Sequence, residues 1–293
     1  MTSASLLLNL VIDGFVQGCI YAMLAAGFSL LWWVSGIVHL AHGGVMLVGG
    51  FALYVVLSAF GVSVIPAIAI GAGCSVIVGL AIDTIVYQPL LRRRTDEMGL
   101  LTASLGVLIV LEYALTIAFG PEGATLDPEG LRSPMFAGFL PVLDWFSALI
   151  LLTTCVIFGA LHLVMTRTET GRSLRAVADN PELARVIGVD TPSVYRQVAA
   201  LAAVLALPAA AFLLFNTGLA PSEALHIVLV SAVVAIIGGR GSMLGALVAG
   251  LTIGVAESAT TWQLATGWRQ FVTFAFLYFL LLVRPQGLFG KAA

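Results

Sequence analysis

The feature that most constrains this chain is a series of uninterrupted apolar runs, each long enough to cross a bilayer and nearly free of charge. Hydrocarbon requires every backbone N–H and C=O group to be paired within the protein, so only helices and closed barrels span membranes. Barrel strands would alternate apolar and polar side chains, whereas these runs are continuous. The pattern therefore predicts an all-α fold, a polytopic bundle of transmembrane helices.

The composition leads to the same class of protein. Hydrophobic residues make up 60% of the chain and charged residues only 10%, against about 45–50% and about 25% in soluble domains. A water-soluble fold would have to expose much of this apolar surface, whereas lipid can cover it. The net charge of −2 gives no basic footprint, so we expect membrane lipid and no nucleic acid among the partners.

Nine apolar segments can be distinguished, and they predict about eight or nine membrane segments in a single domain over residues 1–293. The second and seventh are short and flanked by turns with Gly or Pro, which is typical of discontinuous or re-entrant helices. The Gly-rich breaks at 36–50 and 238–250 either mark a substrate path between repeated halves or are ordinary turns. The approximate ranges are 6–33, 43–59, 63–87, 99–119, 142–165, 196–216, 223–237, 243–261 and 270–283.

The positive charges are distributed unevenly across these spans. Of the 13 Lys and Arg residues, all but two fall on one side of the membrane. Cytoplasmic loops carry an excess of Lys and Arg, so this side is predicted to be cytoplasmic, with the N-terminus outside and the C-terminus inside. The inner set is Arg92, Arg93, Arg94, Arg167, Arg172, Arg175, Arg185, Arg196, Arg240, Arg284 and Lys291, and the outer set is Arg132 and Arg269.

Two loops are substantial, an outer one near 120–141 and an inner one near 166–195. The inner loop predicts a two-turn helix, because Asn180 is a good N-cap, Pro181 suits the first helical position and Gly188 can end the helix. Its apolar side chains would either dock on a partner or lie on the lipid surface. They are Leu183, Val186 and Ile187.

The sequence contains no recognisable catalytic or nucleotide-binding motif. The patterns GxxxxGK[ST], HExxH and GxSxG are missing from the chain, so we expect neither a P-loop nor a hydrolase site. His39 and His42 could share a helical face, but no further metal ligands converge on them in the sequence. The chain is therefore predicted not to be an enzyme, and no metal site is predicted.

Three carboxylates within apolar segments need a physical reason, because a charge at the bilayer centre costs about 2.5–3.5 kcal/mol on insertion scales. Glu112 lies halfway along its segment, and either it is protonated or it faces a polar pathway. Glu257 lies near the outer end of its segment, where it is either interfacial or pathway-lining. Asp83 lies near the inner end, where we expect it to reach water beside Arg94.

Small residues recur at every fourth position in several segments. In membranes such rows allow helix backbones to approach closely, so we expect internal packing, with a subunit interface as the alternative for one of them. The rows are Gly14, Gly18, Ala22 and Ala26; Gly71, Ser75 and Gly79; Gly241, Gly245 and Ala249; and Ala246, Gly250, Gly254 and Ser258.

Six stretches, taken in order, resemble one family nearly end to end: the integral permease subunits of branched-chain amino acid ABC transporters, of the LivH type. The first two are GCIYAMLAAGFSLLW and GIVHLAHGGVMLVGGF, the latter similar to the family's N-F-A-H-G-E segment. YQPLLRRR and the inner-loop stretch GRSLRAVADNPELARVIGVDT follow. IIGGRGSMLGALVAGLTIGVAES and VRPQGLFG complete the set. Their order and spacing are more specific than any one of them.

The resemblance implies a permease of a bacterial inner-membrane importer for branched-chain or related amino acids, with no cofactor on this chain. It implies four partners: two cytoplasmic ATPases that bind ATP and Mg²⁺, a second permease or second copy of this chain, and an external solute-binding protein. The inner loop would hold the coupling helix that docks on an ATPase. The implied coupling residues are Gly171, Arg172, Arg175, Asn180, Pro181, Glu182, Leu183, Ala184 and Gly188.

Departures from the family pattern weaken the transfer of substrate identity. His39 stands where Asn is usual, Gly44 stands where Glu is frequent, and Glu112 replaces an amide or apolar residue. The usual Ala-Gly after the coupling loop is also missing. An ion-gradient-driven transporter or channel for a small solute such as urea or an amide is the alternative hypothesis. The candidate pathway residues are His39, His42, Glu112 and Glu257.

Overall fold

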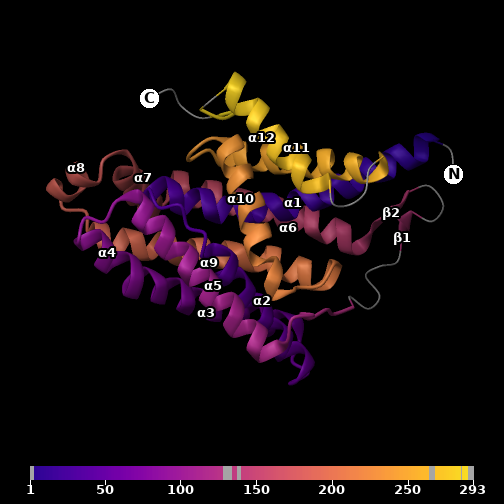
Figure 1. Cartoon of the computed structure of the whole chain (residues 1–293), viewed down its shortest axis with the longest axis horizontal. Helices are drawn as coiled ribbons and strands as arrows, with labels where there is room; N and C mark the ends of the chain where they lie inside the picture. The colour runs from indigo at the N-terminus through magenta and orange to yellow at the C-terminus, as the bar shows by residue number, and fades with distance from the viewer. Residues whose placement is uncertain (1–2, 128–133, 137–139, 264–267, 285, 290–293) are drawn as a thin grey trace.

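The computed structural model describes residues 3–127, 134–136, 140–263, 268–284 and 286–289. In these ranges it is a bundle of helices that run mostly along one long axis, with the N-terminus at one end and the C-terminus toward the other (Figure 1). In chain order the elements are α1 (Ser3–Ser35), α2 (His42–Ser58), α3 (Val64–Ile82), the π-helix η1 (Asp83–Tyr87), α4 (Gln88–Arg92), α5 (Glu97–Phe119), β1 (Pro134–Phe136), β2 (Leu140–Asp144), α6 (Trp145–Arg167), α7 (Glu169–Asp179), α8 (Pro181–Val186), α9 (Thr191–Asn216), the 3₁₀ turn η2 (Pro221–Glu223), α10 (Ala224–Gly238), α11 (Met243–Gln263) and α12 (Arg269–Val283).

The predicted membrane bundle is confirmed. Seven helices in the described part of the chain are long and apolar enough to cross a bilayer, and two further apolar helices are shorter. The shorter ones are His42–Ser58, as expected, and Gln270–Val283. The segment near 223–237, which we also expected to be short, is joined to η2 and reaches spanning length as Pro221–Gly238.

Polar side chains define where several of these helices begin. Asp96 accepts a hydrogen bond from the Gly99 amide at 3.1 Å, and Asp144 accepts one from the Ser147 amide at 2.7 Å. Each carboxylate satisfies a backbone N–H group that has no partner in the first turn of its helix. These caps position the starts of α5 and α6 at the surface of the bundle.

Helix α1 forms the centre of the bundle. In the most apolar stretch of α1, 89% of the residues are buried, whereas in that of α5 only 17% are. Helix α5 therefore presents most of its surface to lipid or to another chain. The glycine rows explain the close packing of α1 on α11: a Cβ atom added at Gly18 would lie 2.7 Å from the Gly250 carbonyl oxygen. The internal-packing interpretation is therefore confirmed for these two rows.

The outer loop contains the only strands described. β1 and β2 pair antiparallel, which adds a short hairpin to a fold that is otherwise helical. The loop also contacts the bundle through an antiparallel bridge between Ala124 and Leu219. Residues 128–133 and 137–139, with Arg132 among them, lie outside the described residues, as do Lys291 and the side chain of Arg269.

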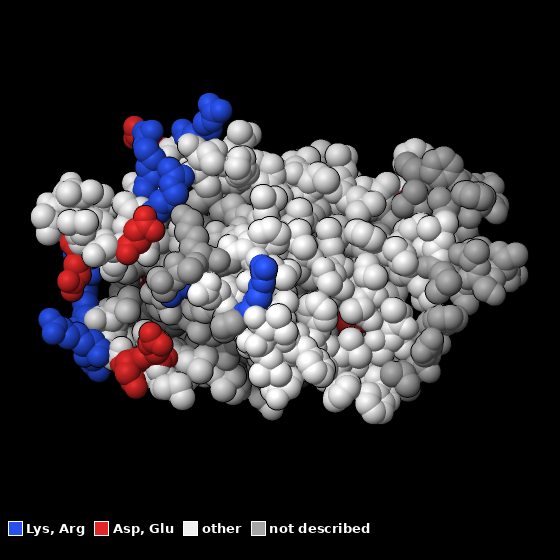
Figure 2. Space-filling model, turned by 90° about the horizontal axis from the view of Figure 1, so that it is seen from above, with Lys and Arg blue, Asp and Glu red and all other residues white. Residues whose placement is uncertain are grey.

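Charged side chains gather at one end of the molecule. On the face seen in Figure 2, blue and red atoms cluster at the end that carries α4, α7 and α8 in Figure 1, and the rest of the surface is almost uncharged. We call this the charged end. A long surface with few charges is suited to the hydrocarbon core of a bilayer.

Candidate functional site

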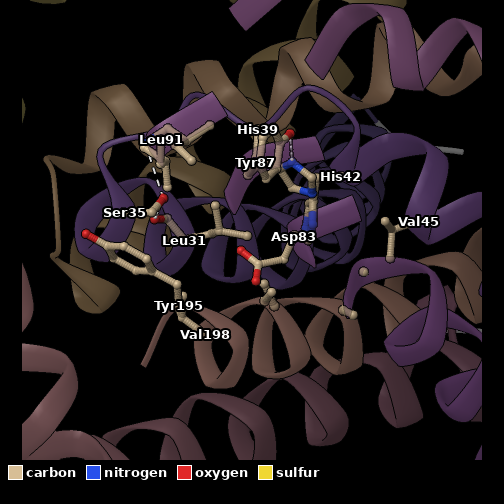
Figure 3. A pocket seen from close by; sticks show the side chains of 15 residues that line it. Leu31, Ser35, His39, His42, Val45, Asp83, Tyr87, Leu91, Tyr195 and Val198 are labelled. Atoms are coloured by element: carbon tan, nitrogen blue, oxygen red, sulfur yellow. Dashed lines mark hydrogen bonds between the residues drawn. The ribbon is translucent and has the colours of Figure 1, made fainter. Parts of the chain in front are cut away.

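Two irregular stretches of backbone meet inside the bundle. One is the break at residues 36–41 between α1 and α2, and the other is the π-helix η1 between α3 and α4. Both contribute side chains to one small cavity, in which His39, His42, Asp83 and Tyr87 come together (Figure 3). Non-helical backbone at membrane depth is tolerated where it is buried in protein or lines a cavity, and π-turns are frequent at functional sites.

A short hydrogen-bonded chain holds the upper part of this cavity. The His39 Nδ1 atom lies 2.5 Å from the Tyr87 hydroxyl oxygen, and the Tyr87 hydroxyl donates to Ser104 Oγ at 3.0 Å. Ser104 Oγ also accepts a hydrogen bond from the Ala41 amide at 3.0 Å. Because the Tyr87 hydroxyl donates its proton to Ser104, the Tyr87 oxygen is left as the acceptor for the N–H group at His39 Nδ1. The chain therefore ties the break at 36–41 to η1 and α5.

His42 and Asp83 contribute the remaining polar groups. His42 is 1% exposed, and its Nε2 atom has no hydrogen-bond partner among the described residues. The ring is packed against α1, since a Cβ atom added at Gly27 would lie 3.0 Å from His42 Cε1. Asp83 is 5% exposed and accepts a hydrogen bond from Gln88 Nε2 at 2.8 Å. The expectation that Asp83 reaches water beside Arg94 is wrong, because η1 turns this carboxylate into the protein.

The cavity itself is small. The volume within which the centre of a water molecule can lie is about 10 Å³, and this is room for roughly one water. Apolar residues of α1, α2 and α9 complete its wall. An amino acid does not fit here, so the cavity is not a transport path for such a solute in this conformation. Its residues are Leu31, Ser35, Ile37, His39, His42, Val45, Gly79, Asp83, Tyr87, Leu91, Tyr195, Val198, Ala199, Ala202 and Ala203.

A larger cleft opens at the charged end next to this cavity. It has a volume of about 580 Å³ and is lined by residues of α4, the loop that follows it, and the segment from α8 to α9. Leu91 and Tyr195 line both the cleft and the cavity, so the two spaces adjoin. Arg92, Arg94 and Arg185 contribute positive charge to the cleft.

The inner loop contains more helix than the sequence predicted. Between α6 and the predicted two-turn helix lies α7, an amphipathic helix that packs Leu174 and Val177 against the bundle. Thr168 caps it by accepting a hydrogen bond from the Gly171 amide at 3.1 Å. A Cβ atom at Gly171 would collide with the backbone carbonyls of α6, so this glycine permits the sharp turn from α6 into α7.

Helix α8 is the predicted two-turn helix. The Asn180 side-chain oxygen accepts hydrogen bonds from the Glu182 and Leu183 amides, both at 3.0 Å, and Gly188 follows the helix with a φ of 91°. The predicted cap and stop are therefore confirmed. Ala184 is buried and fixes the inner face of α8. The outer face is apolar and exposed, with exposures of 59%, 81% and 70% for Leu183, Val186 and Ile187.

The other two coupling candidates lie on α7. Arg172 is exposed and forms a 3.5 Å ion pair with Glu169, one turn earlier in the same helix. Arg175 is half-buried one turn further on. A solvent-exposed ion pair of this kind contributes at most about 1 kcal/mol, so Arg172 remains available to a partner.

The structure does not bring the four pathway candidates together. His39 and His42 share the cavity, but neither Glu112 nor Glu257 lines it. Glu112 is half-buried on α5, next to the outward-facing Tyr113. Glu257 is 3% exposed and lies between helices, where it accepts hydrogen bonds from Tyr21 at 2.8 Å and from Thr273. Groups of three or more metal-ligating side chains were not found among the described residues.

Tyr87 and Ser104 are functional-site residues that sequence reasoning missed. Each is a polar residue within an apolar segment, but other polar residues in the same segments give no weaker a signal. Their proximity to His39 could not be predicted from the sequence, because it depends on the π-turn at η1. A one-residue change in helix register rotates every later side chain, and the apolar pattern does not reveal it.

Comparisons with known proteins agree on one family. The family model described as "Branched-chain amino acid transport system / permease component" matches residues 10–281. The chain is 26% identical to the high-affinity branched-chain amino acid transport system permease protein LivH of Salmonella typhimurium, covering 97% of this chain and 96% of that protein. It is also 26% identical to the corresponding protein BraD of Pseudomonas aeruginosa, with the same coverage. It is 24% identical to a probable LivH permease of Methanocaldococcus jannaschii, covering 96% and 92%.

A solved structure has a similar fold. The chain aligns with PsaBC from Streptococcus pneumoniae in complex with Fab, with a TM-score of 0.52 and 11% identity over 94% of this chain and 91% of that one. At this identity the similarity concerns the fold alone.

Proposed function

The chain belongs to the family of branched-chain amino acid transport system permease components, and from this premise we propose that it is the membrane-spanning subunit of an ATP-driven importer for branched-chain or related amino acids. The observation that carries the proposal is the match of the family model over residues 10–281, because it covers the bundle and the inner loop together. Transport components of this kind move a solute and leave its bonds unchanged, which is consistent with a chain that lacks hydrolase motifs.

The geometry of α8 supports its role as the coupling helix. It is short, capped by Asn180, ended by Gly188 and located at the charged end (Figure 1). Exposed apolar residues on a charged surface are typical of a docking contact. Leu183, Val186 and Ile187 would enter a groove of the ATPase, and α7 would transmit the movement to α6 and α9. The buried Ala184 and the Arg185 Nε–Thr191 Oγ1 hydrogen bond at 2.9 Å fix α8 to the bundle.

The orientation and the partners follow from the same proposal. The charged end is cytoplasmic by the positive-inside rule and faces two ATPases, on which ATP and Mg²⁺ bind. The opposite end, with β1 and β2, faces an external solute-binding protein. A second permease, either a homologue or another copy of this chain, completes the importer in the bacterial inner membrane. The weakly buried α5 offers surface for that contact.

Co-purification tests this assignment directly. The tagged chain is purified from native membranes in mild detergent or polymer nanodiscs, and the accompanying proteins are identified and assayed for ATP hydrolysis. We expect P-loop ATPases and a second permease, with hydrolysis stimulated by a binding protein loaded with an amino acid. Recovery of the chain alone under several gentle conditions would support the gradient-driven alternative.

A further inference from the structure

The cavity between the break at 36–41 and η1 has the properties of a binding site that the proposed transport function does not use. We propose that it holds one water molecule and, through that water, binds a proton shared by His42 and Asp83, with access from the charged end. The inference concerns a site inside one chain. Only the last of its tests depends on the proposed function.

Unsatisfied polarity is the first support. His42 Nε2 is buried and has no hydrogen-bond partner among the described residues, and leaving such a group unpaired costs about 1–3 kcal/mol. The cavity that His42 lines has room for roughly one water. Asp83 lines the same cavity, and the bond from Gln88 leaves acceptor capacity on its carboxylate. A water in this position would have at least two polar partners.

The ionisable groups around the cavity explain why a proton would bind there. The break and α2 contribute His39 and His42, η1 contributes Asp83 and Tyr87, and α9 contributes Tyr195. His39 is already engaged through Nδ1 with Tyr87. Neutral imidazole has one lone pair free for a second proton, so proton uptake by His42 gives an imidazolium that lines the same cavity as the Asp83 carboxylate. No other bond is made or broken.

One charged group outside the cavity acts on the Asp83 carboxylate. Arg196, on the first turns of α9, interacts electrostatically with Asp83. α1, α3 and α5 contribute only uncharged groups to this region, such as Ser35, Gly79 and Ser104. An opposite charge nearby favours the ionised carboxylate. Burial of Asp83 is the larger influence and acts against its ionised form, and Arg196 opposes that influence in part.

The residues that line both the cavity and the cleft at the charged end indicate the route by which a proton would enter. Leu91 and Tyr195 separate the cavity from the cleft at the charged end. Small movements of these two side chains would connect the cavity to water at the charged end. Protonation would draw the start of α2 toward η1, which is already joined to the preceding break at 36–41 through His39 and Tyr87.

Histidine-selective NMR tests the site without any transport assay. The sequence has four histidines, so the full chain labelled with ¹³C,¹⁵N-histidine in lipid nanodiscs gives four sets of ring signals. Gln variants at His39, His162 and His226 assign His42 by elimination, and His42→Gln provides the direct check. We expect a water contact at the His42 ring and a change from neutral imidazole to imidazolium as the pH is lowered from about 8 to about 4.

Asp83→Asn is the decisive variant. It keeps the side-chain size but removes the carboxylate, so the pH midpoint of the His42 transition should fall by at least about one unit, a tenfold higher proton concentration. The exposed His162 on α6 is the matched control and should keep its midpoint. A His42 ring that stays neutral and dry over the whole range, or a midpoint unchanged in Asp83→Asn, would overturn the proposal.

A sided transport assay then asks whether the proton matters to the importer. With ATP inside proteoliposomes and the binding protein outside, the lumen corresponds to the cytoplasm. We expect His42→Gln and Asp83→Asn to change the luminal-pH profile of uptake in the same way, with no further change in the double variant. His162→Gln should behave as wild type. An equal response to external pH would contradict access from the charged end, whereas no uptake by wild type would count against the proposed function only.

Discussion

At the scale of residues, a few positions have roles that can be tested separately by mutation. Gly188 sets the end of α8, Glu257 joins three helices, and His42 with Asp83 forms the proposed proton site. Gly188 has a φ of 91° and open space around its Cα, so backbone conformation rather than crowding requires glycine there. Glu257, on α11, accepts hydrogen bonds from α1 and α12, which indicates a role in packing.

Gly188→Val should uncouple ATP hydrolysis from uptake. A β-branched residue in the left-handed region costs about 1–3 kcal/mol, which would displace the end of α8 while leaving the bundle intact. We expect hydrolysis to persist and uptake to fall at least tenfold, both measured in proteoliposomes. Gly159→Ala is the control, because Gly159 also has nothing near its added Cβ atom but lies within a regular helix. Normal coupled transport in Gly188→Val would argue against the coupling role.

Glu257→Leu should lower the thermal stability of the chain more than Glu257→Gln does. Leucine removes the acceptor of two buried hydroxyl groups, at about 1–3 kcal/mol for each group left unsatisfied, whereas glutamine keeps one carbonyl oxygen. Unfolding in detergent, followed by a thiol-reactive dye or by light scattering, measures the difference. Glu112→Leu, at a half-buried position, is expected to have little effect on stability. Equal melting of wild type and Glu257→Leu would exclude the packing role.

At the scale of elements, the interface between α1 and α11 is the best-defined contact of the bundle. Glycines of both helices lie opposite one another, so the two backbones approach closely. Lipid provides no hydrophobic drive for helix association, so such contacts supply the stability. The burial of α1 on nearly all sides makes this contact a requirement for the whole fold.

Gly18→Val should prevent correct assembly of the bundle. The added Cβ atom would lie 2.7 Å from the Gly250 carbonyl oxygen and from Leu251 Cα, both of which are backbone atoms without freedom to move. Overpacking of this kind typically costs about 1–3 kcal/mol or more. We expect loss of monodisperse protein in size-exclusion chromatography. Gly73→Val, at a helical glycine with open space around it, should purify normally.

Much of the element structure was predictable from the sequence, and the reasons are local. Continuous apolar runs give the spans, Asn180 and Gly188 delimit α8, and the spacing of Gly14 and Gly18 indicates close packing. The convergence of His39, Asp83 and Tyr87 was not predictable, because it depends on the π-turn and on which helices become neighbours. The apolar pattern also left α7 unrecognised, since its charged outer face resembles that of a loop.

At the scale of the whole molecule, the charge distribution determines how the chain sits in the membrane. The charged end with α8, and the few charges on the rest of the face seen in Figure 2, are consistent with ATPases on one side and a binding protein on the other. The lightly buried α5 and the half-buried Glu112 leave a surface to be covered by a second permease or by lipid. The exposed apolar side chains elsewhere need no other explanation than lipid contact.

The predicted orientation can be checked with single cysteines. In a background without the three native cysteines, Glu122→Cys in the outer loop should react with a membrane-impermeant thiol reagent in intact cells. Arg172→Cys on α7 should react only after the inner face is opened. Both residues are exposed, so a difference in labelling between the two variants reports the side of the membrane and not burial of the side chain. The reverse pattern would show that the charged end lies outside.

The measurement that tests the central claim most directly is uptake of labelled leucine into proteoliposomes reconstituted from the purified chain and its co-purifying partners. The account predicts accumulation that requires luminal ATP and an external binding protein, and that is lost when either is omitted or when the ATPases are inactivated. Equilibration of the solute by this chain alone, or accumulation driven by an ion gradient without ATP, would contradict it.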